Sequence, residues 1–201
     1  MTEHASTLKG FGGISREEGA DLGTLSAVYF DPENKTVSSF SFRSRRHGSG
    51  DYFVPVSEVQ LVGRDVILVS TMEARTKVEA KIKPPGMRLN ELQGRWVTGM
   101  DGKHLGTLVD IDFSQTDWKI TELTFADGRH LKVEADEIVI GDEILVPKEY
   151  ASRLGPAPEG KKGLIERAFG KEFFENTRNA LKRTSRRDKA KNEKGKEEES
   201  E

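Results

Sequence analysis

The side chains best suited to metal binding or proton transfer are the four histidines, at positions 4, 47, 104 and 130. No pair of them has the one-turn helical spacing of a metal site, and no histidine shares an element with a carboxylate at a metal-ligand spacing. His104 and His130 fall in predicted turns, where we expect surface roles. Because the chain has no cysteine, a zinc ribbon, a disulfide and a thiol nucleophile are all excluded.

Three aspartates form the densest group of oxygen ligands. Asp110 and Asp112 share one face of a predicted strand, and Asp117 follows closely. Oxygen ligands of this kind can bind a hard cation. However, the segment lacks the loop glycine and the closing glutamate of a calcium-binding loop. We therefore expect these carboxylates to line the solvated side of the strand, and we predict no metal site.

Motifs that bind nucleotides or activate a serine are missing from the sequence. Gly10-Phe11-Gly12-Gly13 is rich in glycine but is followed by neither a helix nor a Lys-Ser/Thr pair, so it does not predict a phosphate-binding loop. Trp96 and Trp118 fit core or rim packing better than base stacking. The loop Arg43–Gly50 could contact phosphate or an acidic protein, but we favour a solvated hairpin tip. The sequence predicts no catalytic residues, no cofactor and no enzymatic activity.

The strongest pattern in the chain is an internal repeat. Gly19–Leu25 matches Gly102–Leu108 at an offset of 83 residues. After a longer loop in the first copy, Gly63–Leu68 matches Gly141–Val146 at an offset of 78. The first offset also pairs apolar residues, namely Val28 with Ile111, Phe30 with Phe113, Val37 with Ile120, Phe40 with Leu123 and Phe42 with Phe125. Such agreement indicates two copies of one fold.

Each copy has the pattern of short β-strands. Val109, Ile111 and Phe113 alternate with aspartates, as expected of a strand with one buried face. Asp127-Gly128 marks a hairpin turn. Five or six strands in about 60 residues are too few for a large sandwich but can close into a small barrel. The fold class predicted is therefore all-β, with two small β-barrels in tandem.

These residues resemble the PRC-barrel family, which includes the cytoplasmic part of the photosynthetic reaction-centre H subunit and a barrel of a ribosome maturation factor. In the second copy, Glu91–Val97 resembles the opening Leu-x-Gly-x-x-Val element of the family. Asp101–Leu108, Asp110–Phe113 and Ile138–Val146 continue the match. In the first copy, Leu8-Lys9-Gly10 is similar to the same opening element. The resemblance covers about residues 8–70 and 88–148.

The resemblance implies a small β-barrel that serves as an adaptor, and it implies no active-site residues. Two differences prevent a specific function from being carried over. The H subunit has a membrane-spanning helix before its barrel, and this sequence shows no apolar stretch of that length. The ribosome factor has a different β-domain before a single PRC barrel, whereas both copies here are PRC-like.

The domain organisation predicted from composition has six parts. They are a first barrel (1–75), a linker (76–87), a second barrel (88–152), a Gly/Pro-rich linker (153–161), an amphipathic helix (162–184) and a disordered charged tail (185–201). Pro84-Pro85-Gly86 ends the first linker, which could contain a short helix. The tail from Arg186 has no apolar residue larger than alanine.

The predicted helix over 162–184 is the candidate interaction surface. Its apolar residues and its basic residues recur at helical spacing on nearly opposite sides. The residues proposed to contact a partner or a membrane are Ile165, Arg167, Phe169, Lys171, Phe173, Arg178 and Lys182. Gly170 lowers helix stability by about 1 kcal/mol relative to alanine, so we expect the helix to need a surface to order it.

Charge divides the chain into an acidic and a basic part. The net charge is −6 over residues 88–150 and +7 over residues 161–191. The basic segment could dock on the acidic second copy within or between chains, lie on an anionic membrane, or bind RNA phosphates. Interleaved Glu166, Glu172 and Glu175 favour protein docking.

The function that these features predict is a non-enzymatic protein-binding adaptor or scaffold. A protein partner is expected, and self-association and peripheral contact with an anionic membrane are open, whereas nucleic-acid binding is not favoured. The alternative is a ribosome- or RNA-associated assembly factor. We see no signal peptide at the N-terminus and expect a cytoplasmic location, either free or peripheral to the inner membrane surface.

Overall fold

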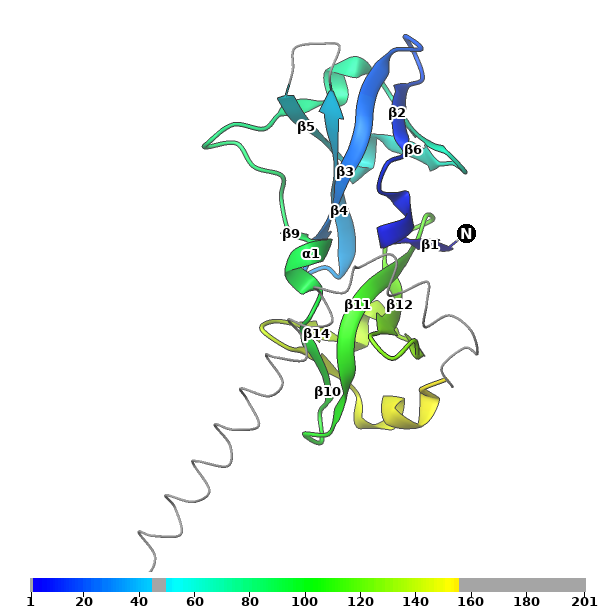
Figure 1. Ribbon diagram of the computed structural model, residues 1–201, viewed down its shortest axis with the longest axis vertical. Helices are drawn as coiled ribbons and strands as arrows, with labels where there is room; N and C mark the ends of the chain where they lie inside the picture. The colour runs from blue at the N-terminus through cyan, green and yellow to red at the C-terminus, as the bar shows by residue number, and fades with distance from the viewer. Residues whose placement is uncertain (1, 45–49, 156–201) are drawn as a thin grey trace, which may run out of the picture. The chain divides into compact units, whose positions relative to one another are not determined.

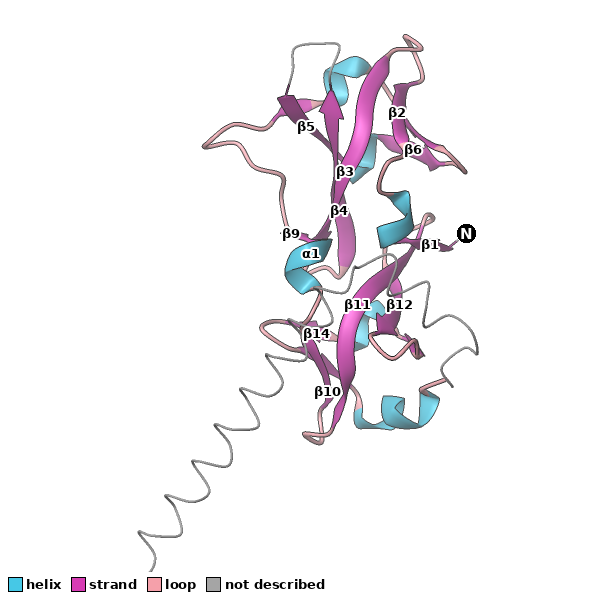
Figure 2. Ribbon diagram, viewed as in Figure 1, coloured by secondary structure: helices cyan, strands magenta, loops and turns pink. Residues whose placement is uncertain are grey.

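The computed structural model describes residues 2–44 and 50–155, which fall within one compact unit. Strands make up about half of the described chain and its helices are short (Figure 2). None of the described helices is long and apolar enough to cross a membrane. The predicted helix over 162–184, with its seven candidate surface residues, and the tail over 185–201 lie outside the described residues.

The first copy forms one bent sheet whose strands follow the order β6-β7-β2-β3-β4-β5-β8. Its neighbours are antiparallel except for the parallel pair β2 and β7. Figure 1 labels several of these strands. The strands are β2 (Gly12–Ser15), β3 (Asp21–Asp31), β4 (Thr36–Ser44), β5 (Gly50–Pro55), β6 (Val59–Val62), β7 (Val66–Val69) and β8 (Thr76–Lys77).

The second copy repeats this topology without a counterpart of β8, in the order β14-β15-β10-β11-β12-β13. Its parallel pair, β10 and β15, is equivalent to β2 and β7. The long strands β3 and β11 begin 83 residues apart and have the same length. The strands are β10 (Trp96–Gly99), β11 (His104–Ser114), β12 (Ile120–Phe125), β13 (His130–Lys132), β14 (Val139–Ile140) and β15 (Ile144–Val146).

Short helical turns connect these strands, and several of them are also repeated. The 3₁₀-helix η1 corresponds to the α-helix α1, and η2 corresponds to η4. The first connector contains η3 together with β8 rather than a longer helix, and η5 ends the described chain. The bounds are η1 (Ala5–Leu8), α1 (Leu89–Leu92), η2 (Val56–Glu58), η3 (Met72–Ala74), η4 (Ala135–Glu137) and η5 (Lys148–Arg153).

The repeated glycines make the same turns in both copies. Gly10 and Gly94 both have a positive φ, and each donates a backbone hydrogen bond to the equivalent leucine of the long strand. Gly63 and Gly141 close the tight turns predicted before β7 and β15 by bonding to Val66 O and Glu143 O. The opening element of the first copy therefore adopts the conformation of the second despite its divergent sequence.

The two copies exchange a strand with each other. β1 (Thr2–His4), at the start of the first copy, pairs with β11 of the second copy. In return β9 (Met87–Arg88), at the start of the second copy, pairs with β3 of the first. The registers are equivalent, because Glu3 lies opposite Phe113 as Met87 lies opposite Phe30. Each barrel is thus completed by a strand from the other.

The tips of two equivalent hairpins hold the copies together as well. Val37 N donates to Trp118 O at 2.8 Å, and Ile120 N donates to Lys35 O at 2.9 Å. The two bonds are equivalent, because replacing each residue by its counterpart in the other copy converts one bond into the other. Lys35 and Trp118 are the two non-glycine residues with a positive φ in the described chain. The junction therefore has the reciprocity of a twofold dimer interface.

A single apolar core extends through both copies. All five apolar pairs predicted from the offset of 83 are buried on both sides. Phe113 contacts the rings of Phe30, Phe40 and Trp118, with centroids 6.0–6.4 Å apart. The two-barrel fold predicted from the repeat is confirmed, and the barrels are fused through their cores.

Candidate functional site at the exchanged strand

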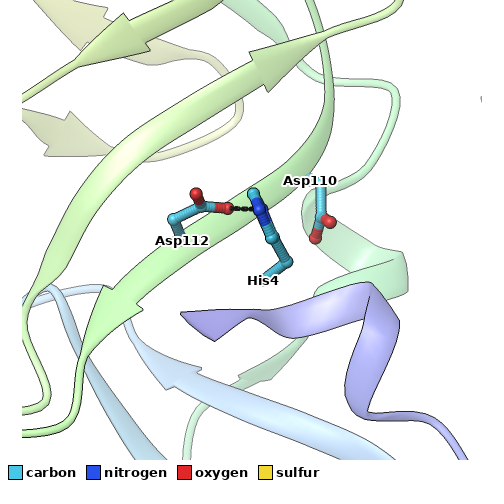
Figure 3. Close-up of side chains that lie close together, drawn as sticks. All are labelled: His4, Asp110 and Asp112. Atoms are coloured by element: carbon cyan, nitrogen blue, oxygen red, sulfur yellow. Dashed lines mark hydrogen bonds and ion pairs between the residues drawn. The ribbon is translucent and has the colours of Figure 1, made fainter. Parts of the chain in front are cut away.

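A cluster of ionisable side chains lies where the exchanged strand β1 meets β11. His4 comes from β1, and Asp110 and Asp112 come from neighbouring positions of one face of β11 (Figure 3). One potential ligand atom of each residue lies within 4.8 Å of those of the other two. Residues more than a hundred positions apart in the sequence are therefore brought together by the strand exchange.

Hydrogen bonds connect the cluster to the N-terminal segment. His4 Nδ1 and Asp112 Oδ1 lie 2.5 Å apart as an ion pair. Ser6 in η1 donates to Asp110 twice, from its backbone N at 3.1 Å and from its hydroxyl at 2.5 Å. Both aspartates thus fasten the first residues of the chain to the second copy.

The expectation that Asp110 and Asp112 face solvent is wrong. They are 6% and 3% exposed, because β1 and η1 cover this face of β11. The period-2 pattern correctly separated them from the barrel core on the other face. It could not show that a distant segment packs over the polar face. Asp117, the third candidate, is exposed and lies apart from the cluster.

Burial and charge shift the pKa values of two members of the cluster. The hydrogen bond to Asp112 raises the pKa of His4 above its ordinary value, with support from the charges of Asp112, Asp110 and Glu122, while partial burial opposes the rise. Burial raises the pKa of Asp110, an effect that the hydrogen bonds from Ser6 and Ile111 reduce. The environment therefore favours a protonated imidazole beside Asp112.

The first copy has a different interaction at the equivalent position. Arg88 takes the place of His4 and Tyr29 the place of Asp112. The Arg88 guanidinium lies over the Tyr29 ring, 5.6 Å from its centroid. A cation on the exchanged strand therefore meets an electron-rich group on the long strand in both copies. The carboxylates belong to the second copy alone, since Ala27 is the equivalent of Asp110.

The other two histidines of the described chain occupy polar clusters of their own. His104 begins β11 and lies 3.0 Å from Thr98 Oγ1, which donates to Glu143. His130 begins β13 and lies 3.0 Å from Glu122 and 3.1 Å from Thr124 Oγ1. In each case the histidine bonds through Nδ1 alone to its neighbours. In neither group does the histidine contact a hydroxyl through one ring nitrogen and a carboxylate through the other, the arrangement that activates a hydroxyl.

The predictions for the two tryptophans can be compared with the structure, whereas those for the interaction residues cannot. Trp118 packs against Phe40 and Phe113 at the junction, which confirms core packing. Trp96 is partly buried and contacts the His104 ring. The seven predicted interaction residues lie outside the described residues, so their predicted role stays a prediction. They are Ile165, Arg167, Phe169, Lys171, Phe173, Arg178 and Lys182.

Comparison with known families agrees with the repeated topology. The family model for the PRC-barrel domain matches the chain twice, at residues 2–75 and 84–155. The chain belongs to the PRC-barrel family. No curated protein matches it by sequence. PRC-barrel domains are generally binding modules of the protein-interaction type rather than catalysts.

The tandem PRC-barrel body should lose stability as the pH rises through the raised pKa of His4. Stabilisation from a protonated His4 is fully present below the unfolded pKa, about 6.5, and disappears as the folded group deprotonates. Asp110 acts in the same direction at lower pH, because its raised pKa also favours the protonated folded form. Urea midpoints measured with a chelator between about pH 5 and about pH 9 should therefore fall with pH.

The variant His4→Gln separates the contributions of His4 and Asp110 to the pH dependence of stability. It should remove the decline above about pH 6.5 and leave the decline at acidic pH, which Asp110 causes. His104→Gln changes a histidine outside the cluster and should keep the whole wild-type profile. A wild-type midpoint that rises with pH through the neutral range would contradict the ion pair.

Proposed function

We propose that this protein is a non-enzymatic adaptor whose two fused PRC barrels bind a protein partner. The proposal agrees with the general role of the family as a binding module. The polar clusters around His4, His104 and His130 connect strands to one another, and in none of them does a histidine join a hydroxyl to a carboxylate through its two ring nitrogens. The segment 162–184 would then anchor the assembly through its apolar and basic residues.

The observation that carries the proposal is a pair of exposed aliphatic residues on the terminal strands of the two sheets. Leu61 of β6 is 45% exposed and Val139 of β14 is 49% exposed. They are equivalent under the offset of 78, so the repeat presents the same feature twice. Among the described residues, β6 and β14 each pair with one strand only. A terminal strand with an exposed aliphatic side chain suits an added peptide strand.

The interaction surface can be tested by affinity capture with quantitative proteomics. The full chain should capture one or a few proteins specifically, and Leu61→Ser with Val139→Ser should reduce that capture about fivefold or more, the size of a moderate interface contact. Met100→Ser is the matched control, since Met100 is also exposed but lies outside the two terminal strands. Equal loss in the control, or no loss in the double variant, would exclude these strands as the surface.

A truncated chain tests the anchoring role of the C-terminal segment. It should end after Gly155, because Tyr150 is fully buried and Leu154 packs against the core. We expect the truncation to fold and to capture less partner. Sedimentation with anionic and neutral vesicles tests membrane contact directly. A steep loss of RNA binding between low and physiological salt would support the assembly-factor alternative instead.

A further inference from the structure

We propose that His4, Asp110 and Asp112 form a binding site for a divalent cation of the zinc class, which fastens the exchanged strand β1 to β11. The site is independent of the adaptor function. It combines an imidazole and two carboxylates from two strands that meet only because the copies exchange their first strands (Figure 3).

The three side chains are nearly in place for one ion. Zinc binds histidine nitrogen and carboxylate oxygen at about 2.0–2.2 Å, so two ligands at the tetrahedral angle lie about 3.4 Å apart. The ligand atoms of the cluster already lie within 4.8 Å of one another. Side-chain movements of about 1 Å would therefore complete a tetrahedral coordination, with His4 Nδ1 exchanging its contact with Asp112 for the ion.

The charge of the cluster is unbalanced without an ion. When both buried carboxyl groups are ionised they face a single imidazole, and buried charges in proteins are normally paired or bound to a metal. Asp112 has a side chain that is 4% exposed, and the contact of its Oδ1 with His4 Nδ1 brings it a single positive group. A divalent cation would supply both the missing positive charge and a ligand partner for this carboxylate.

The ligand types favour zinc over calcium or magnesium. Calcium takes six to eight oxygen ligands and magnesium retains several waters, whereas zinc is satisfied by three nitrogen or oxygen ligands with one water. His4 is about half exposed, which leaves a route for the ion and for that water. Ser6, bonded to Asp110, would hold this ligand in position from outside the coordination sphere.

The role inferred for the ion is structural. In the first copy, Arg88 on the exchanged strand is held by the Tyr29 ring, which requires no ion. In the second copy the equivalent pair is His4 and Asp112, and the added carboxylate of Asp110 turns the contact into a set of ligands. The stability of the pairing between β1 and β11 would therefore depend on a bound cation, whereas the pairing between β9 and β3 would not.

Titration of the full chain, free of any histidine tag, tests the site directly. Zinc would be added in competition with a chromophoric chelator, with calcium as a separate arm. We expect one zinc ion per chain, and at least about a tenfold loss of affinity in His4→Gln and in Asp112→Asn. His104→Gln, which removes a histidine outside the cluster, should bind zinc normally. Amide hydrogen exchange in β1 should slow when zinc binds to the wild type alone.

Several outcomes would overturn the proposal. They are no saturable zinc binding, equal loss in His104→Gln, and binding that survives Asp112→Asn, which would indicate His4 acting with the chain terminus. Calcium binding that survives His4→Gln would indicate an acidic surface site. Because Asp112→Asn could unfold the protein, each variant is first compared with the wild type by urea unfolding. If it does unfold, His4→Gln at the half-exposed residue decides the question.

Discussion

Replacing Phe113 by alanine should lower the free energy of unfolding by about 3–5 kcal/mol, the cost of truncating a fully buried aromatic side chain. The Phe113 ring is inaccessible to solvent and contacts Phe30 and Phe40 of the first copy and Trp118 of the second. These neighbours belong to both copies, so filling the cavity would require residues to move at the junction itself. We therefore expect little relaxation and a cost near the upper end of this range.

The same variant tests whether the two copies unfold together. Urea unfolding would be followed by tryptophan fluorescence, which reports on Trp118 at the junction and on Trp96 in the second copy, and by circular dichroism of both sheets. We expect one coincident transition in the wild type and one at lower urea in Phe113→Ala. Met100→Ala is the control, because Met100 is exposed and its loss should change stability by less than about 0.5 kcal/mol. Two separate transitions, with only one of them shifted, would contradict a shared core.

The tandem repeat is therefore the covalent equivalent of a symmetric dimer. Equivalent residues meet at the junction, such as Phe30 with Phe113 and Thr36 with Lys119. Strands β1 and β9 are exchanged in equivalent registers. In a homodimer both halves of such an interface must be identical. Fusion into one chain removes that restriction, which explains how His4 and Asp112 can occupy one half while Arg88 and Tyr29 occupy the other.

Much of the fold could be predicted because both copies keep glycines at turns and apolar residues at alternate positions of their strands. The geometry of the backbone explains both choices. Gly63 and Gly141 mark the same turn, and the alternation of Val28 with Phe30 marks the same buried face as Ile111 with Phe113. Local spacing was sufficient for these features, since turns and strand faces depend on neighbours in the sequence.

The candidate site could not be predicted by the same means. The alternation in β11 indicates that Asp110 and Asp112 share a face, but the residues that cover this face lie more than a hundred positions away. A repeat alone suggests that each copy keeps its own first strand. The short segment Thr2–His4 gives no local sign that it joins the other sheet. Only its equivalence with Met87–Arg88, found by aligning Leu8-Lys9-Gly10 with Leu92-Gln93-Gly94 at an offset of 84, could have indicated a reciprocal exchange.

Replacing Gly23 by alanine should cost about 3 kcal/mol or more, because two independent penalties combine. Gly23 has a φ of +106°, a conformation that costs an L-residue about 1–2 kcal/mol. A Cβ atom at this position would also overlap the backbone of β4, including Arg43 O, Arg43 C at 2.7 Å and Ser44 Cα at 2.8 Å. Since these are backbone atoms of the neighbouring strand, the overlap can be relieved only by separating β3 from β4.

Gly19→Ala provides a matched control at the preceding turn of the same copy. Gly19 also has a positive φ, +64°, but a Cβ atom there would meet no atom within 4 Å, so only the conformational cost of about 1–2 kcal/mol applies. Urea unfolding of the two variants should therefore differ by about 1–2 kcal/mol or more. Equal stabilities would mean that the close approach of β3 and β4 at Gly23 is not required. A larger loss in Gly23→Ala, with unfolding of both copies in one transition, would show that damage to one hairpin is transmitted through the shared core to the other barrel.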